Sequence, residues 1–327
     1  MTRLSIVIPV LGNVAELERT LVSVLAGRPD DCEIVAVLNT AYDDPYDLAD
    51  EVRFVAARPK AGFVECVNLG LQHSRSPVIH VLAAGLEPRE GWADAALEQF
   101  DDPQVAAVAP LIVASGIEGR PLAAGLRYRL GGTRVVNVPR KPLTALATER
   151  IVVLGPCGVA AFYRAEALAA VGGGMPNVLG NDLADVQLAL ELQAAGYRAV
   201  FDARAEIVAD HIPMFDGRGL QHGLYSERLF WLHAGERNKF LSLCLHPFSV
   251  LGDILAALPS LAALLQAAGR FWACCQFGFY RQPTHRQDRK AAKTKLPSGH
   301  RLDPAHETAA DAAKSTPVRT GDRVRSR

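Results

Sequence analysis

Apolar runs of strand length alternate with segments of helical periodicity along the first third of the chain. The runs, in order, are residues 5–10, 33–39, 52–57, 78–84 and 105–114. Each run is continuous rather than alternately apolar and polar, which is typical of strands covered on both faces of a sheet. The pattern predicts an α/β fold with a mostly parallel central sheet and helices on both faces.

The segment after the first run has the clearest helical pattern. Its apolar stripe consists of Leu17, Leu21, Val24 and Leu25. Asn13, followed three residues later by Glu16, has the spacing of a capping box at the start of this helix. The helix is expected to begin directly after the first strand, at the edge of the sheet where open α/β folds bind their ligands.

Charge is distributed unevenly along the chain. The formal net charge is zero, but residues 281–327 hold twelve Lys and Arg against five Asp and Glu, a net charge of +7. Residues 1–280 therefore carry a net charge of −7, which argues against nucleic-acid binding by this part of the chain. The tail is poor in apolar residues and is expected to be disordered.

Other features exclude several classes of protein. The six cysteines show no CxxC spacing, so neither a disulfide framework nor a zinc site is expected. The opening MTRLSIVIPV has too short an apolar stretch for a signal peptide, which favours the cytoplasm. No GxGxxG follows the first strand and no GxxxxGK motif occurs, which argues against a dinucleotide-dependent oxidoreductase.

Five separated stretches form an ordered set of motifs. They are LSIVIPVLGNVAELERTLVSVLA, EIVAVLNTAYDD, KAGFVECVNLGL, GPCGVAAFYRAEALAAVGGG and ADVQLALELQAAGYRAVF. In this order they resemble the landmarks of family 2 glycosyltransferases of GT-A fold, over roughly residues 3–212. The resemblance implies a GT-A-like domain at residues 1–222 that uses a nucleotide-sugar donor.

The resemblance implies that the donor nucleotide lies at the carboxyl ends of the first strands. Pro9 and the loop after it would lie against the base. In the family an acid at the end of the second strand reads the base, but Leu38 stands there in this chain. Base recognition is then expected from Asn39 or Asp43, with a solvated turn as the alternative for Asp43.

The segment KAGFVECVNLGL holds further donor candidates. Gly62 would let the backbone approach the nucleotide, and Asn68 on the following helix is expected to contact it rather than only to pack. Lys60 lies two residues before Gly62 and is the first choice for a basic group on the diphosphate. Arg58 and Arg89 are the other choices, and ordinary surface charge is the alternative for all three.

The Asp-x-Asp motif that holds a divalent metal in the family falls on Ala83, Ala84 and Gly85. The metal-binding carboxylates are therefore missing, although a leaving diphosphate still needs its charge offset by a cation or by fixed donors. Glu87 and His211 are the remaining candidate ligands for Mg²⁺ or Mn²⁺, and a lone carboxylate makes a poor site for either ion.

The acceptor side is expected in the second half of the chain. Asp185 keeps the acid of a Glu-Asp pair in the family, and the resemblance makes it the general base that takes the acceptor's hydroxyl proton. Asp182, one turn earlier, is the competing assignment, and helix capping is the alternative for both. Gly155, Cys157 and Gly158 would line the acceptor side through close backbone approach.

Residues 223–280 are expected to form a helical segment. Residues 225–248 have the pattern of one helix, and the uncharged run from Ile254 to Gly269 is shorter than the ~20 residues needed to span a bilayer. This run and the aromatic stretch 271–280 are expected to lie in a membrane surface or, alternatively, to form an ordinary helical subdomain. The basic tail beside them favours an anionic membrane.

The sequence thus predicts an inverting glycosyltransferase that moves a sugar from a nucleotide-sugar donor to a glycan or lipid-linked acceptor. The enzyme is expected to act in cell-surface polysaccharide synthesis, on the inner face of the membrane. The alternative is a catalytically inactive glycosyltransferase-like scaffold or regulatory protein. Asp185 favours activity, whereas Leu38, Ala83 and Gly85 favour the scaffold.

Overall fold

The computed structural model describes residues 2–116, 119–129, 132–139, 146, 151–212, 219–233, 239–257 and 260–276. The basic tail expected from residue 281 lies outside these described residues. The last four residues of the aromatic stretch 271–280 lie outside them as well.

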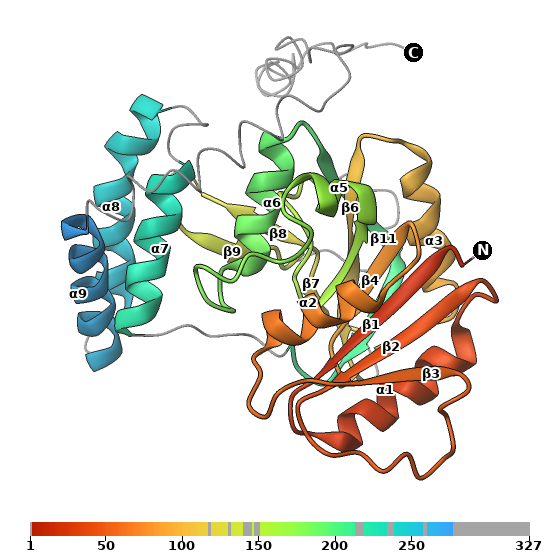
Figure 1. Ribbon diagram of the computed structural model, residues 1–327. Coiled ribbons are helices and arrows are strands. Elements are labelled where there is room, and N and C mark those ends of the chain that lie inside the picture. The colour runs from red at the N-terminus through yellow and green to blue at the C-terminus, as the bar shows by residue number, and fades with distance from the viewer. Residues whose placement is uncertain are drawn as a thin grey trace, which may run out of the picture. The chain divides into compact units, whose positions relative to one another are not determined.

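A mixed sheet forms the centre of the fold (Figure 1). In the described residues its strand order is β3 (Val52–Ala56), β2 (Cys32–Leu38), β1 (Leu4–Val10), β4 (Val78–Leu82), β10 (Ala160–Arg164), β6 (Val105–Ala114), β11 (Arg198–Ala209) and β5 (Leu86–Pro88), and β7 (Pro121–Ala123) pairs with β6. All five strands expected from the apolar runs are present, which confirms the predicted α/β fold class.

The sheet is parallel only in part, which corrects the expectation of a mostly parallel sheet. β1 pairs in parallel with β2 and β4, β2 with β3, and β6 with β11. β10 lies between β4 and β6 and is antiparallel to both. Because of this reversal, the loop before β10 meets the carboxyl end of β4, and Ala160 pairs with Leu82.

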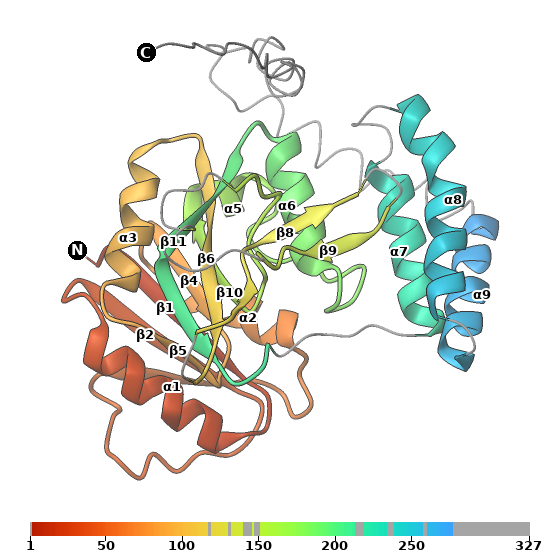
Figure 2. The ribbon, with the colours of Figure 1, turned by 180° about the vertical axis from the view of Figure 1, so that it is seen from behind.

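Helices cover both faces of the sheet, as expected. α2 (Phe63–His73) packs on β1 and β2, whereas α1 (Val14–Gly27) packs on β1 and β5, and α3 (Trp92–Glu98) on β11. Figures 1 and 2 show α2 on one side of the sheet and both α1 and α3 on the other. The 3₁₀ helix η1 (Gln99–Asp101) follows α3, while α5 (Ala165–Ala170) and α6 (Ala184–Ala194) follow β10.

The apolar stripe of α1 is correct, but its expected capping box is wrong. Leu17, Leu21 and Val24 are buried under the sheet. Asn13 is the N-cap residue of α1, and all of α1 lies in the described residues, yet the Asn13 side chain accepts no capping hydrogen bond. The carbonyl of Glu16 instead accepts the Gly85 amide at 3.1 Å, so the first turn of α1 holds the loop after β4.

A two-stranded hairpin lies outside the central sheet. β8 (Leu126–Tyr128) and β9 (Arg134–Val136) pair in antiparallel orientation. The Leu126 amide donates to the Gly155 carbonyl at 2.7 Å, and the Leu154 amide donates to the Leu126 carbonyl at 2.8 Å. The hairpin is thereby fixed to the loop before β10, and Arg134 at the start of β9 meets the first turn of α6.

Among the residues described after the central fold are three helices: α7 (Leu220–His233), α8 (Lys239–Ala257) and α9 (Leu261–Cys275). The expectation of a single helix over 225–248 is wrong, because α7 ends at His233 and α8 begins at Lys239. Within the residues that the structure describes, no helix has both the length and the apolar character needed to cross a membrane.

A buried acid links the three C-terminal helices. Glu227 on α7 is 3% exposed, and its carboxylate lies 2.9 Å from His246 Nε2 on α8 and 3.3 Å from Arg270 Nη1 on α9. Burial alone would raise the pKa of Glu227, but the hydrogen bond and charge of His246 and the charge of Arg270 lower it. The carboxylate therefore fastens α8 and α9 to α7.

α7 and α9 also cross with their backbones in contact. A Cβ atom at Gly269 would lie 2.0 Å from the Leu220 carbonyl oxygen, so Gly269→Ala forces the two helices apart. We expect this substitution to lower the free energy of unfolding by about 1–3 kcal/mol in chemical denaturation.

Gly252→Ala in α8 is the matched control. A Cβ at Gly252 would meet nothing within 4 Å in the described structure, and alanine is favoured over glycine in helices by roughly 0.5–1 kcal/mol. Equal stability of the two variants would contradict the close crossing of α7 and α9.

Candidate active site

The candidate donor residues converge on one edge of the sheet, at the carboxyl ends of β1, β2 and β4. The carbonyl of Pro9, in β1, accepts the Ala84 amide at 3.3 Å. The side-chain amide of Asn39, which follows β2, donates to the Ala61 carbonyl at 2.9 Å and joins this strand end to the loop before α2. Asp43 is exposed a few residues further on.

The loop in place of the Asp-x-Asp motif is a packed turn. The Ala83 amide donates to the Val159 carbonyl at 2.8 Å, and the Gly85 amide donates to Thr20 Oγ1 at 2.9 Å. Ala83 and Ala84 are buried, and Gly85 has a φ of +90°, a conformation that favours glycine. The loop offers backbone and methyl groups to the donor edge and no side-chain ligand to a metal ion.

The two expected metal ligands do not form a metal site. Glu87 lies 3.7 Å from Arg19 Nη1, and the same guanidinium pairs with Asp210 at 2.7 Å, next to the exposed His211. In the described parts of the chain, no group of three His, Cys, Asp or Glu side chains could hold a metal ion. Because Mg²⁺ and Mn²⁺ need several oxygen ligands, the residues that the structure describes around this loop do not fit a divalent metal.

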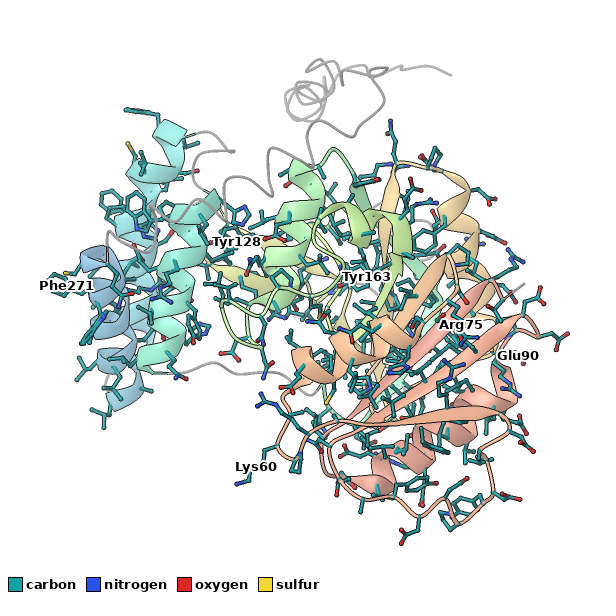
Figure 3. All side chains as sticks on the ribbon, viewed as in Figure 1. Lys60, Arg75, Glu90, Tyr128, Tyr163 and Phe271 are labelled. Atoms are coloured by element: carbon teal, nitrogen blue, oxygen red, sulfur yellow. The ribbon has the colours of Figure 1, made fainter. Side chains whose placement is uncertain are left out.

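Of the three basic residues expected to replace a metal ion, two form ion pairs and the third is exposed. Arg58 pairs with Glu65, and Arg89 pairs with Glu206 at 2.7 Å. Lys60 is exposed in the turn before α2, with a φ of +65°, and its side chain extends away from the ribbon (Figure 3). Lys60 directly precedes Ala61, whose carbonyl accepts the Asn39 amide, so its backbone adjoins the donor edge.

α2 begins beside the expected Gly62, and a loop covers its first turn. Asn181 Oδ1 accepts the Val64 amide at 3.2 Å, and a Cβ at Gly62 would lie 2.9 Å from Asn181 Nδ2. Asn68 Nδ2 donates to the Met175 carbonyl at 2.9 Å, and Asn68 Oδ1 accepts the Met175 amide at 2.7 Å. The Asn68 amide thus holds the loop before α6, and its contact with the donor stays a prediction.

The expected general base, Asp185, lies in the first turn of α6 with 9% of its side chain exposed. Oδ1 accepts from Arg134 Nε at 3.2 Å and from the Val186 amide at 2.7 Å. Oδ2 accepts from Arg134 Nη2 at 2.7 Å and from the Gly158 amide at 3.2 Å. A carboxylate offers about four acceptor directions, so all of them are occupied.

Arg134 is the site residue that the sequence did not indicate. It stands in a stretch without a motif, and only the pairing of β8 with β9 brings it to α6. Burial alone would lower the pKa of Arg134, but the Asp185 carboxylate raises it, so the guanidinium stays charged. The pair is bidentate, which is the strongest geometry for an arginine and a carboxylate.

A narrow cavity lies at Asp185. It measures about 20 Å³, which is room for about one water molecule. Two residues in its wall connect it to the expected donor residues: Phe63 follows Gly62, and the Val159 carbonyl accepts the Ala83 amide. Among the described residues that line this cavity, Arg134 is the one cation.

The expected acceptor residues divide into two groups. The Gly158 amide binds Asp185, and Cys157 lines the cavity as an uncharged thiol because burial raises its pKa to about 12. Gly155 instead allows α6 to pack closely, since a Cβ there would lie 2.6 Å from Ala189 Cβ. Cys157 and Gly158 therefore reach the site, and Gly155 supports it.

A second cavity of about 410 Å³ adjoins the first. It lies between the β8–β9 hairpin, the start of α6 and the C-terminal helices, and Arg134 lines both cavities. Its lining includes Tyr128, Thr133, Asp182, His222, Asp253 and Gln266. Asp182, the competing candidate base, lies here with its carboxylate 3.5 Å from His222 Nδ1.

Comparison with known proteins identifies the family. The model of glycosyl transferase family 2 matches residues 5–172, more than half of the chain. The chain belongs to glycosyl transferase family 2. The match ends before Asp185 and the C-terminal helices, so in this family 2 chain the second cavity is built partly by elements beyond the matched region.

Two curated relatives are the pre-mycofactocin glycosyltransferases of Mycobacterium tuberculosis strains CDC 1551 / Oshkosh and ATCC 25618 / H37Rv. Each is 27% identical to this chain over 214 residues, which is 63% of this chain and 42% of the relative. The family 2 chain thus spans less than half the length of these relatives.

A solved structure of GalNAc-T7 with UDP, GalNAc and Mn²⁺ is similar to this chain at a TM-score of 0.57 and 14% sequence identity. The similarity covers 85% of this chain and 57% of GalNAc-T7. At this identity the likeness shows the fold alone, and it confirms the predicted GT-A fold of the family 2 chain.

Proposed function

We propose that this family 2 chain transfers a sugar from a nucleotide-sugar donor to an acceptor hydroxyl, with inversion at the anomeric carbon. The observation that carries the proposal is the place of Asp185. It is a buried carboxylate in a cavity whose wall adjoins the donor edge of a GT-A sheet. The family match and the expected donor residues at the ends of β1 and β2 support the same function.

In this reaction the acceptor oxygen attacks the anomeric carbon from the face opposite the diphosphate. The new glycosidic bond forms as the bond from that carbon to the diphosphate oxygen breaks. Asp185 takes the proton of the acceptor hydroxyl, and the nucleoside diphosphate leaves with the bonding electrons. A single displacement of this kind inverts the configuration of the transferred sugar.

The larger cavity is our proposed acceptor site. Its volume of about 410 Å³ lies within the usual range for small-molecule pockets, about 300–1,000 Å³. Charged groups in its wall have partners in the wall: Asp182 lies near His222, and Asp253 accepts from Thr133 Oγ1 at 3.2 Å. A polar wall with paired charges suits the hydroxyl groups of a glycan or of the sugar in a lipid-linked acceptor.

Donor binding is expected to depend little on divalent cations, because the loop at Ala83–Gly85 carries no metal ligands. Calorimetry with UDP, GDP, ADP and CDP should find at least one that binds, with affinities in EDTA and in Mn²⁺ that agree within about threefold. Lys60→Ala should weaken this binding by up to about fivefold, because an exposed charge pair contributes about 0.2–1 kcal/mol.

Arg58→Ala is the matched control, since Arg58 is in the same turn as Lys60 but is already paired with Glu65 in the first turn of α2. We expect it to bind nucleotide as the wild type does. Binding that appears only with Mn²⁺ would contradict the metal-independent site.

We also propose that α8 and α9 dock on an anionic membrane surface. Their exposed large apolar side chains include Phe240, Leu243, Phe248, Leu251, Leu255, Leu261, Leu264, Phe271 and Trp272. Phe240 is 80% exposed, and Phe271, 74% exposed, points outward from α9 in Figure 3. Exposed apolar surface of this extent marks a site of interaction, and the basic tail that follows α9 in the sequence suits anionic lipid. Such docking supports a role in cell-surface polysaccharide synthesis on the inner membrane face.

The second candidate function is a scaffold or regulatory protein without activity. The observation that favours it is the packed turn at Ala83–Gly85, together with the nearly filled cavity at Asp185. A scaffold would bind none of the nucleotides in the calorimetry experiment, in EDTA or in Mn²⁺.

A further inference from the structure

The pairing of Arg134 with Asp185 prevents Asp185 from acting as the base of the proposed reaction. A carboxylate that accepts four hydrogen bonds has no lone pair free for a proton from the acceptor. The cavity beside it admits about one water molecule, so it has no room for a sugar ring that brings a hydroxyl to Asp185. Arg134 must move before Asp185 can act as a base.

The negative charge of the donor diphosphate can draw Arg134 away from Asp185. A nucleoside diphosphate at the edge formed by Pro9, Asn39 and Ala83 needs counter-charge, and the residues there do not fit a metal ion. Arg134 is the one cation among the described residues lining the adjoining cavity, and 21% of its side chain is exposed. A planar guanidinium binds a phosphate by the same bidentate geometry that it uses on a carboxylate.

We propose that Arg134 is a latch operated by the donor: it leaves Asp185 to bind the diphosphate, and its departure frees Asp185 for the acceptor. This inference rests on the proposed glycosyl transfer and assigns a donor-binding residue to it. Because Arg134 lines both cavities, its movement also removes the wall between Asp185 and the proposed acceptor site. The donor must therefore bind before the acceptor can reach the base.

The latch predicts opposite effects for the two partners on nucleotide affinity. Asp185→Asn weakens the hold on Arg134, so the nucleoside diphosphate found to bind should bind at least threefold more tightly to this variant. Arg134→Gln should weaken diphosphate binding at least about tenfold and leave binding of the matching monophosphate within twofold. Arg134→Lys should recover part of the loss, because it keeps the charge.

The double variant Arg134→Gln with Asp185→Asn separates binding from folding. It leaves no unpaired buried charge, so its fold is retained, yet it should lose diphosphate affinity as Arg134→Gln does. Arg127→Gln, on β8 of the same hairpin, is the matched control and should bind as the wild type.

Calorimetry with the diphosphate and its monophosphate measures all of these variants. Wild-type affinity in the double variant, or unchanged affinity in Asp185→Asn, would overturn the latch and leave the proposed function standing. Failure of the wild type to bind any nucleoside diphosphate would overturn the proposed function and the latch together.

Discussion

Replacing Asp185 with asparagine is expected to lower the rate of sugar transfer at least about a hundredfold. The amide cannot accept the proton that the acceptor hydroxyl loses as the glycosidic bond forms. Asparagine has nearly the same shape and its side-chain oxygen can still accept the Gly158 amide, so the variant should stay folded. It should be less stable, because Arg134 loses its counter-charge, and it should bind the nucleotide at least threefold more tightly. The measurement is single-turnover release of nucleoside diphosphate from the donor sugar that the wild type uses.

Asp182→Asn is the matched control for this experiment. Asp182 lies one turn earlier, in the wall of the proposed acceptor site and 3.5 Å from His222, so its loss can weaken acceptor binding but, at saturating acceptor, should change the transfer step by no more than about threefold. A transfer rate for Asp185→Asn within a few-fold of the wild type would move the role of base to Asp182 or contradict the enzymatic function.

Deletion of the chain from residue 281 is expected to lower binding to anionic vesicles by at least about tenfold. The tail carries a net charge of +7, and each Lys or Arg near an anionic surface contributes about 1 kcal/mol at low salt. Cosedimentation with phosphatidylserine vesicles, compared with neutral vesicles and repeated at high salt, measures this contribution.

The apolar face of α9 should contribute separately from charge. The double variant Phe271→Ser and Trp272→Ser, two residues that are 74% and 59% exposed, should weaken vesicle binding also at high salt. Val22→Ser on α1 is the control, because Val22 is 72% exposed in a helix of the central fold. Equal recovery of the full and shortened chains in the supernatant, without vesicle binding, would favour an ordinary helical subdomain.

Local patterns were sufficient to predict the layered fold. Continuous apolar runs located β1, β2, β4 and β6, because strands covered on both faces have little room for polar side chains, and a similar run located the end strand β3, which is only partly buried. The antiparallel insertion of β10 was not predicted, since strand direction depends on pairing between residues far apart in sequence. The helix expected over 225–248 failed for a similar reason: apolar periodicity runs through both α7 and α8.

In the candidate site, too, residues within sequence motifs were predicted, and a residue brought in by long-range strand pairing was not. Asp185 and Gly158 were found because they stand in ordered motifs, and the structure places them 3.2 Å apart between Oδ2 and the amide. Arg134 has no such motif, and it reaches Asp185 only through the β8–β9 hairpin. Asn68 in mid-helix was expected to have a hydrogen-bond partner, and it has one in the Met175 backbone, while its contact with the donor stays a prediction.

Metal-independent transfer with Asp185 as the base is tested most directly by release of nucleoside diphosphate in EDTA. The full chain on anionic vesicles is supplied with a glycan acceptor mixture and a panel of UDP-, GDP-, ADP-, CDP- and dTDP-sugars. We predict that at least one donor is turned over in EDTA, that Mn²⁺ changes the rate by no more than about threefold, and that Asp185→Asn abolishes at least about 99% of it. Turnover that requires Mn²⁺, or that is equal in the wild type and Asp185→Asn, would contradict a metal-independent transfer with Asp185 as the base.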